Sequence, residues 1–136
     1  MALDLGKRRI GLAISDELGL TAQGLPTLER TNIRGDLAHL AQLAQANNVK
    51  LILIGNPLHM SGEEGRQSRH AREFAARLHA ATGLPTELWD ERLTTVSAQR
   101  VLRASGISIE KRAKAVDRMA AVILLESFLD SGQPRT

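Results

Sequence analysis

Cysteine is absent from this chain of 136 residues. Its absence excludes disulfide bonds, thiol nucleophiles and cysteine zinc sites, and with them thiol redox chemistry. Aromatic side chains are almost as scarce, since only Phe74, Trp89 and Phe128 are present. A platform on which single-stranded bases stack is therefore not expected, and any bound nucleic acid would be held mainly through its phosphates.

Long apolar runs are missing as well. No segment approaches the roughly 20 apolar residues of a membrane span, and the chain does not start with the charged, apolar and small-residue parts of a secretory signal. The composition, with 43% hydrophobic and 24% charged residues, is typical of a soluble globular protein. We expect a single domain over residues 1–136, located in the cytoplasm, with no membrane partner.

Basic residues exceed acidic ones only slightly: 18 Lys and Arg against 15 Asp and Glu give a net charge of +3. This excess permits a nucleic-acid partner without requiring one. The basic residues come in short groups within residues 7–9, 66–72 and 111–118. A solvated surface explains any one of these groups taken alone.

The apolar pattern predicts alternating strands and helices. Three β-compatible runs come first, and Gly24 and Pro26 mark the third as a bulged or edge strand. A continuous apolar run at 49–55 is typical of a parallel strand buried on both faces. The predicted strands are 2–6, 9–15, 20–29, 49–55 and 84–91, and the predicted helices are 35–47, one that contains residues 71–78, 93–106 and 116–132. This order predicts an α/β fold with a mixed five-stranded sheet, antiparallel over the first three strands and then parallel, with helices on both faces.

Asp4 is a carboxylate within the first apolar strand. Because side chains alternate along a strand, Ala2, Asp4 and Gly6 share one face while leucines take the other. The strand at 9–15 repeats this pattern of small residues on one face and bulky ones on the other. The shallow face leaves room near Asp4 for a close helix, a metal or a substrate backbone. An ion pair with an arginine, or tight helix packing alone, would explain it structurally.

A second pair of carboxylates, Asp90 and Glu91, ends the strand at 84–91. The carboxyl ends of parallel strands are where open α/β sheets place their ligands. Alternation puts the two side chains on opposite faces, so only one of them is expected to join Asp4. The other is free to pair with Arg92 or to cap the next helix, and the pattern alone does not say which one joins.

The third carboxylate, Asp117, lies in the last predicted helix. Ala121, Leu124 and Phe128 follow it at helical spacing, so it belongs to the stripe that packs on the sheet. A structural alternative is that an acidic residue in the first helical turn complements the helix dipole. Each of these carboxylates, taken alone, is explained structurally.

Convergence of the three carboxylate positions on one face changes this interpretation. Three such groups would repel one another unless a divalent cation neutralised them, and oxygen ligands suit Mg²⁺ or Mn²⁺. Two ions about 4 Å apart position water and stabilise the departing alkoxide in an in-line displacement. The pattern therefore indicates hydrolysis of phosphodiester bonds, with the basic groups at 7–9 and 111–118 holding flanking phosphates.

Four motifs in this order resemble one known family. They are "ALDLGKRRIGLAISD", "LILIGNPLHMSGEEG", "LWDERLTT" and "AVDRMAAVILLESFL", and together they span nearly the whole chain. They are similar to the YqgF family, also called RuvX, of nucleases that resemble Holliday-junction resolvases or act on pre-16S rRNA.

The resemblance implies a ribonuclease H-like fold and a metal-dependent hydrolase of the bacterial cytoplasm that processes the 5′ end of the 16S rRNA precursor. Carried over to the matching positions, Asp4, Glu91 and Asp117 are the catalytic and metal-binding carboxylates, on a site for two Mg²⁺ or Mn²⁺ ions. The resemblance thus selects Glu91 rather than Asp90.

The partners expected on this basis are precursor rRNA and ribosomal particles, bound by a monomer or a homodimer. The residues expected to contact the nucleic acid are Lys7, Arg8, Arg66, Arg69, Arg92 and Lys114, with Ser61 and Thr94 adding neutral hydrogen bonds. Two alternatives stay open: a resolvase of branched DNA with the same site, and a non-catalytic partner in ribosome assembly or transcription that has kept the fold.

Overall fold

The computed structural model describes residues 1–16, 18–57, 65–90 and 109–130, and it describes the side chains of the last helix from residue 119 to 129. The elements are β1 (Ala2–Leu5), β2 (Arg9–Ser15), β3 (Ala22–Glu29), α1 (Ile33–Ala46), β4 (Ile52–Asn56), α2 (Arg66–Thr82), β5 (Thr86–Asp90) and α4 (Ile109–Asp130). The predicted helix over 93–106 lies outside the described residues.

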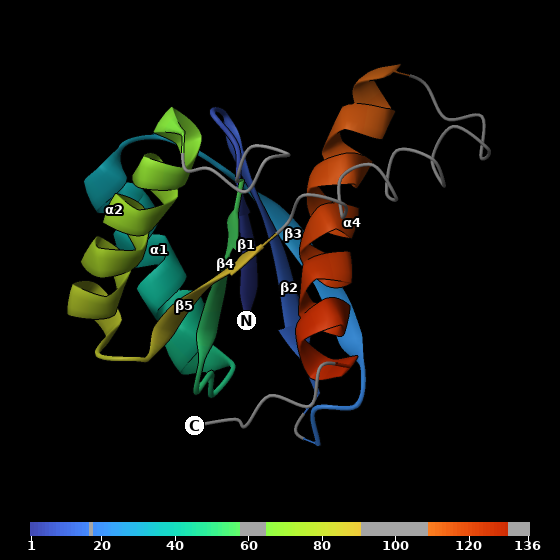
Figure 1. The fold of residues 1–136 in the computed structure, drawn as a ribbon, viewed down its shortest axis with the longest axis horizontal. Helices are drawn as coiled ribbons and strands as arrows, with labels where there is room; N and C mark the ends of the chain where they lie inside the picture. The colour runs from blue at the N-terminus through green and yellow to red at the C-terminus, as the bar shows by residue number, and fades with distance from the viewer. Residues whose placement is uncertain (17, 58–64, 91–108, 131–136) are drawn as a thin grey trace.

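The five strands form one mixed sheet in the order β3-β2-β1-β4-β5. The pairs β1–β2 and β2–β3 are antiparallel, whereas β1–β4 and β4–β5 are parallel. This is the predicted arrangement, and it places β1 at the centre. The carboxyl ends of β1, β4 and β5 therefore lie along one edge of the sheet, and all three strands run upward in Figure 1.

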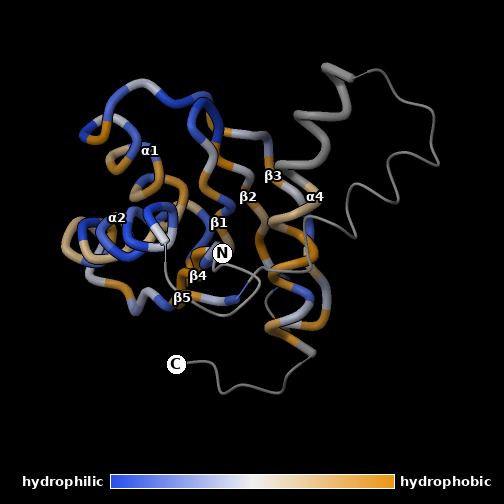
Figure 2. The backbone as a smooth tube through the Cα atoms, turned by 45° about the horizontal axis from the view of Figure 1, so that its top comes forward, coloured by the Kyte–Doolittle hydropathy of each residue, from blue (hydrophilic) through white to orange (hydrophobic). Residues whose placement is uncertain are grey.

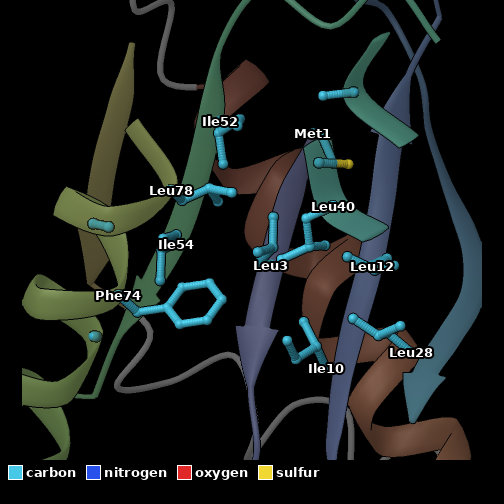
Figure 3. Close-up of a cluster of buried hydrophobic side chains, with 13 residues drawn as sticks. Met1, Leu3, Ile10, Leu12, Leu28, Leu40, Ile52, Ile54, Phe74 and Leu78 are labelled. Atoms are coloured by element: carbon cyan, nitrogen blue, oxygen red, sulfur yellow. The ribbon is translucent and has the colours of Figure 1, made fainter. Parts of the chain in front are cut away.

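Helices cover both faces of the sheet, as predicted. Helices α1 and α2 pack on one face and α4 lies across the other (Figure 1). The larger core lies under α1 and α2, where Leu3, Leu12 and Ile54 meet Leu40 and Leu78 (Figure 3). Hydrophilic residues gather instead at the turns that join β1 to β2 and β3 to α1 (Figure 2).

The face beneath α4 is built from smaller side chains. Ala2 of β1 pairs in register with Ala13 of β2, and both are fully buried against Ala121 and Leu124 of the helix. Small residues let the helix approach the sheet closely, which is one of the uses predicted for this shallow face.

Strand β3 is an edge strand with a bulge, as Gly24 and Pro26 predict. Its register with β2 shifts between Ile10 and Leu12. Proline has no N–H to donate to a neighbouring strand, so it is tolerated in an edge strand, where its nitrogen can face away from the sheet, or at a bulge.

Two helices begin earlier than the apolar spacing predicts. Helix α1 begins at Ile33 because the side chain of Asn32 caps it, accepting a hydrogen bond of 2.8 Å from the Gly35 N–H. The prediction that the last helix begins at residue 116 is wrong, because α4 begins at Ile109. The basic segment that includes Lys114 is therefore part of this helix and does not precede it. Among the described residues, no helix is long and apolar enough to cross a membrane.

Candidate active site

Asp4 lies on the central strand, one residue before the end of β1. By strand alternation it shares the face of Ala2, which packs beneath α4. Its register partner on β2 is Gly11, which has no side chain to fill the space beside it. The Asp4 side chain is half-buried. Asp4 thus occupies a shallow position at the edge where the parallel strands end.

The structure separates Asp90 from Asp4. Leu88 packs in the core under α1 and α2, whereas Trp89 packs against Phe128 of α4. Alternation along β5 then places Asp90 with Leu88, on the face opposite Asp4. Asp90 is exposed and pairs in register with Asn56 of β4. Glu91 lies outside the described residues.

Asp117 is the ninth residue of α4, counted from Ile109. The alternative that it complements the dipole from the first helical turn is therefore wrong, because the effect fades beyond that turn. Asp117 precedes the buried Ala121 by one turn. Strand β1 and helix α4 run in opposite directions, so the first half of α4 and the end of β1 lie toward the same edge (Figure 1). The Asp117 side chain is not among the described ones.

The described residues contain no group of three or more metal-ligating side chains. Two of the three predicted ligands, Glu91 and the side chain of Asp117, lie outside them. The convergence of the carboxylates therefore stays a prediction.

The predicted nucleic-acid contacts divide into three groups. Lys7 and Arg8 are exposed in the turn between β1 and β2, and Arg66 and Arg69 are exposed in the first turn of α2. Lys114 lies in α4, outside the described side chains. The remaining predicted contacts, Ser61, Arg92 and Thr94, lie outside the described residues.

A cleft of about 950 Å³ opens beside the ends of the parallel strands, on the side of α1 and α2. It brings together three of the predicted phosphate contacts, Lys7, Arg8 and Arg66. Arg69 does not line it, because it lies on another flank of α2. Two arginines outside the basic groups of the sequence, Arg30 and Arg77, also line the cleft, together with His70.

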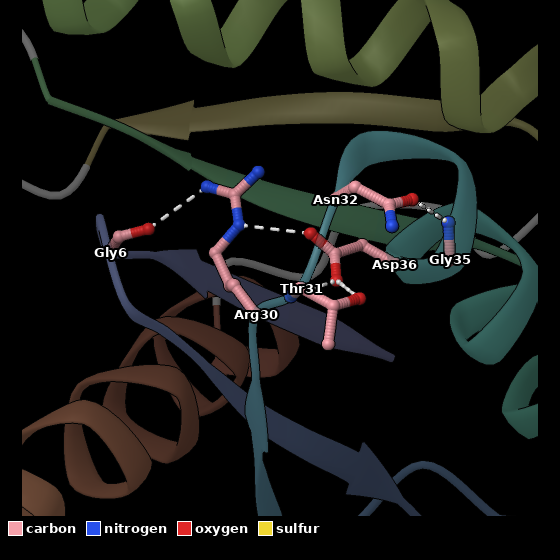
Figure 4. Close-up of polar contacts among 6 residues, drawn as sticks. All are labelled: Gly6, Arg30, Thr31, Asn32, Gly35 and Asp36. Atoms are coloured by element: carbon pink, nitrogen blue, oxygen red, sulfur yellow. Dashed lines mark hydrogen bonds and ion pairs between the residues drawn. The ribbon is translucent and has the colours of Figure 1, made fainter.

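The Arg30 side chain is fixed at the cleft by three partners, and Figure 4 shows two of them, Asp36 and Gly6. Its Nε donates to Oδ2 of Asp36 at 3.2 Å, and its Nη1 donates to the Gly6 carbonyl oxygen at 2.9 Å. Its guanidinium carbon lies 5.6 Å from the centre of the Phe74 ring. Asp36 is buried and also accepts a hydrogen bond of 3.1 Å from the Thr31 N–H. These contacts join the β1–β2 turn to the start of α1.

A single basic residue between a strand and a helix carries no periodic signal, which is why the sequence patterns miss Arg30. The nearest hint is Asp36, a charged residue in the first turn of α1 whose burial requires a partner.

Comparison with known proteins decides the family. The family model described as RuvX: Holliday junction resolvase matches residues 1–131. The chain belongs to the RuvX family. The resemblance carried by the four motifs is thereby confirmed.

Relatives of this RuvX-family chain bear a common name. A protein of Koribacter versatilis named "Putative pre-16S rRNA nuclease" is 53% identical over 130 residues, which are 96% of this chain and 85% of that protein. Proteins of Myxococcus xanthus and Geobacillus kaustophilus with the same name are each 45% identical, over 98% and 96% of this chain and 89% and 96% of theirs. The family description and this name are both those of nucleases, so the expected class of enzyme, a hydrolase of phosphodiester bonds, is confirmed.

Solved structures of RuvC confirm the ribonuclease H-like fold of this RuvX-family chain. RuvC of T. thermophilus in complex with a Holliday junction substrate has a TM-score of 0.59 at 13% identity, over 98% of this chain and 95% of that one. A second structure of RuvC from Thermus thermophilus has a TM-score of 0.56 at 10% identity. At such low identity the likeness concerns the fold alone.

Proposed function

We propose that this chain is a divalent-metal-dependent nuclease of the bacterial cytoplasm that processes the 5′ end of pre-16S rRNA. Asp4, Glu91 and Asp117 would hold Mg²⁺ or Mn²⁺. The name shared by the relatives supports pre-16S rRNA as the substrate. The observation that carries the proposal is the position of Asp4, half-buried on the shallow face beneath α4, at the edge where the parallel strands end.

The surroundings of Asp4 fit a hard cation. The side chain lies opposite Gly11 and two residues from Ala2, so these two neighbours in the sheet leave space beside it. Carboxylate oxygens are the ligands that Mg²⁺ and Mn²⁺ prefer. When bound, such ions would activate a water molecule and stabilise the departing oxygen of the phosphodiester.

The strand order supports a shared site. Strands β1 and β5 are two positions apart in the sheet, so their backbones are separated by about 10 Å. Glu91 directly follows β5, and its longer side chain suits the more distant position. Asp117, on the helix that covers this face, would complete the ligand set from above.

The basic residues of the β1–β2 turn would position the substrate. Lys7 and Arg8 follow Asp4 by three and four residues and are exposed. Ammonium and guanidinium groups bind phosphate oxygens without reading the base sequence, so they would hold the strand and leave the choice of cleavage site to other features.

Substitution of Asp4 tests this proposal. Asp4→Asn keeps the shape of the side chain but removes its charge, so metal-dependent cleavage of a pre-16S rRNA leader should fall by at least about a thousandfold, a loss of roughly 4 kcal/mol in transition-state stabilisation. Asp16→Asn is the matched control, because Asp16 lies at the other end of the sheet, and it should cleave like the wild type. Full activity of Asp4→Asn, with circular dichroism showing an intact fold, would remove Asp4 from the mechanism.

A second candidate is the resolution of branched DNA. The description of the family model and the fold shared with RuvC favour it. Parallel assays with a four-way DNA junction and with the rRNA leader separate the two candidates. We expect faster cleavage of the RNA, whereas symmetric nicking of the junction together with an inert RNA would reverse the order.

A further inference from the structure

The cleft beside α2 lies on the face of the sheet opposite Asp4. It is lined by the β1–β2 turn, by the connection from β3 to α1 and by one side of α2. Five cationic side chains line it against the two carboxylates of Glu29 and Glu73. Its cationic residues are Lys7, Arg8, Arg30, Arg66 and Arg77. A concave surface with this excess of positive charge concentrates anions.

Arg30 is a preorganised donor in this cleft. The bonds to Asp36 and to the Gly6 carbonyl use two of the five N–H groups of its guanidinium, and its side chain is 25% exposed. Because these bonds already fix the side chain, binding an anion would cost little additional conformational entropy. The planar fork matches the geometry of a phosphate group.

The wall formed by α2 extends the charge along the cleft. Arg66, His70 and Arg77 recur at helical spacing and share one side of the helix. Arg66 and Arg77 are exposed, and neither side chain forms a hydrogen bond or ion pair with another described residue. Eleven residues of helix separate them, a distance of about 16 Å along the axis. A line of charge of this length suits an extended polyanion better than a single small anion.

The cleft begins close to the proposed cleavage site. Lys7 follows Asp4 by three residues, so their Cα atoms are at most about 11 Å apart. Phosphates of one strand in a duplex are spaced about 3.4 Å apart along the axis. A strand held at Asp4 could therefore place a phosphate at Lys7 within roughly three nucleotides.

We propose that the cleft around Arg30 is a second nucleic-acid site, which holds the phosphate backbone of the substrate on the side of the sheet opposite the carboxylates. Arg30 and Arg77 join Lys7, Arg8 and Arg66 as phosphate contacts. The substrate thus passes around the end of β1, from the face beneath α4 to the cleft beside α2. This inference rests on the proposed function and adds the path of the substrate.

Binding of a labelled RNA duplex with a single-stranded 5′ extension tests the inference, in EDTA so that cleavage does not interfere. Removing one phosphate contact lowers the slope of log Kd against log salt concentration by about 0.9. At about 0.1 M salt, this loss raises Kd roughly eightfold. We expect this effect for Arg77→Gln and for Arg30→Gln. Lys50→Gln is the matched control, because Lys50 is exposed before β4 at the other end of the sheet, and it should bind like the wild type.

The outcomes distinguish this inference from the proposed function. Arg30 also holds Asp36, so Arg77→Gln, on the exposed side of α2, keeps the test valid if Arg30→Gln unfolds. If Arg77→Gln binds with the slope of the wild type while Asp4→Asn abolishes cleavage, the second site is wrong and the nuclease assignment stands. If Arg77→Gln weakens binding while Asp4→Asn still cleaves, the second site stands and the proposed role of Asp4 falls.

Discussion

Asp4 and Asp16 lie at opposite ends of the sheet, and their surroundings differ. Asp4 is half-buried on a shallow face with Gly11 opposite, whereas Asp16 follows β2 in an exposed turn. One carboxylate oxygen of Asp16 accepts hydrogen bonds from the N–H groups of Leu20 at 2.6 Å and Thr21 at 3.3 Å. Asp16 therefore holds together the turn between β2 and β3. We expect these hydrogen bonds to depend on the negative charge of the Asp16 carboxylate.

The charge of Asp16 should make part of the stability depend on pH. The hydrogen bond from Leu20 is the main cause that lowers the pKa of Asp16 below its ordinary value of 3.8. Because the unfolded chain then binds the proton more readily, the stabilisation is present above pH 4 and is lost as the pH falls through the lower folded pKa.

Thermal denaturation of the wild type and Asp16→Asn checks this expectation. Asparagine resembles the protonated carboxyl group, so the wild type should have the higher Tm at pH 7, and the difference should shrink at pH 3. An equal difference at both values would mean that the shape of the side chain, not its charge, holds the turn.

At the scale of elements, Trp89 joins the end of β5 to α4. Its ring contacts that of Phe128 edge to face, with centroids 5.3 Å apart, and its Nε1 donates to the Ser127 hydroxyl at 3.2 Å. Glu91 comes two residues after Trp89, and Asp117 lies on the same helix α4. The contact therefore fixes the strand and the helix that carry two of the three proposed metal ligands.

Loss of this contact should reduce both stability and cleavage. Trp89→Ala should lower the free energy of unfolding by about 2–4 kcal/mol, since the side chain is half-buried and loses its aromatic partner. Trp89→Phe should cost about 1 kcal/mol, because it keeps an aromatic ring and loses the hydrogen bond. Urea denaturation measures both values.

Leu88→Ala is the control, because Leu88 is half-buried in the other core, against α2. At temperatures where all variants are folded, kcat should fall in Trp89→Ala and stay near the wild-type value in Leu88→Ala. An equal fall in both would mean that Trp89 contributes only to stability.

The apolar spacing predicts the middle of each helix better than its start. Residues 109–115, "IEKRAKA", are mostly good helix formers but have no apolar stripe. Periodicity therefore places the start of α4 too late, whereas intrinsic propensity favours the observed one. In α1 the missing signal is the cap at Asn32, since a cap fixes a helix start without adding an apolar residue.

At the scale of the whole molecule, the proposed metal site would tie together three distant segments. Asp4 belongs to the central strand, Glu91 follows an edge strand and Asp117 lies on the helix that crosses the sheet. A ligand that binds only the folded chain stabilises it by an amount set by its concentration relative to Kd. Cation binding should therefore be visible as stability, independently of any cleavage.

Thermal denaturation with increasing Mn²⁺ or Mg²⁺ measures this effect. At a concentration about 100 times Kd, binding adds about 2.7 kcal/mol, which corresponds to roughly 8–10 °C in Tm for a domain of this size. The shift should be much smaller in Asp4→Asn and unchanged in Asp16→Asn. No shift in the wild type at millimolar Mn²⁺ would favour a non-catalytic partner that has kept the fold.

The sequence by itself determined the strands, their two faces and the family. Alternation separates Leu3 from Asp4 regardless of what packs on either side, because it follows from strand geometry. The same argument puts only one of Asp90 and Glu91 on the face of Asp4, and the structure shows that Asp90 lies on the opposite face.

Only the tertiary structure decided which basic residues share a surface. Arg30 and Arg77 are 47 positions apart in the chain and come together because α1 and α2 pack side by side on one face of the sheet. Arg69 is three positions from Arg66 and lies outside the cleft, because it points from another flank of α2. Local periodicity specifies the face of an element, whereas the meeting of distant elements depends on the strand order and on the packing of helices across it.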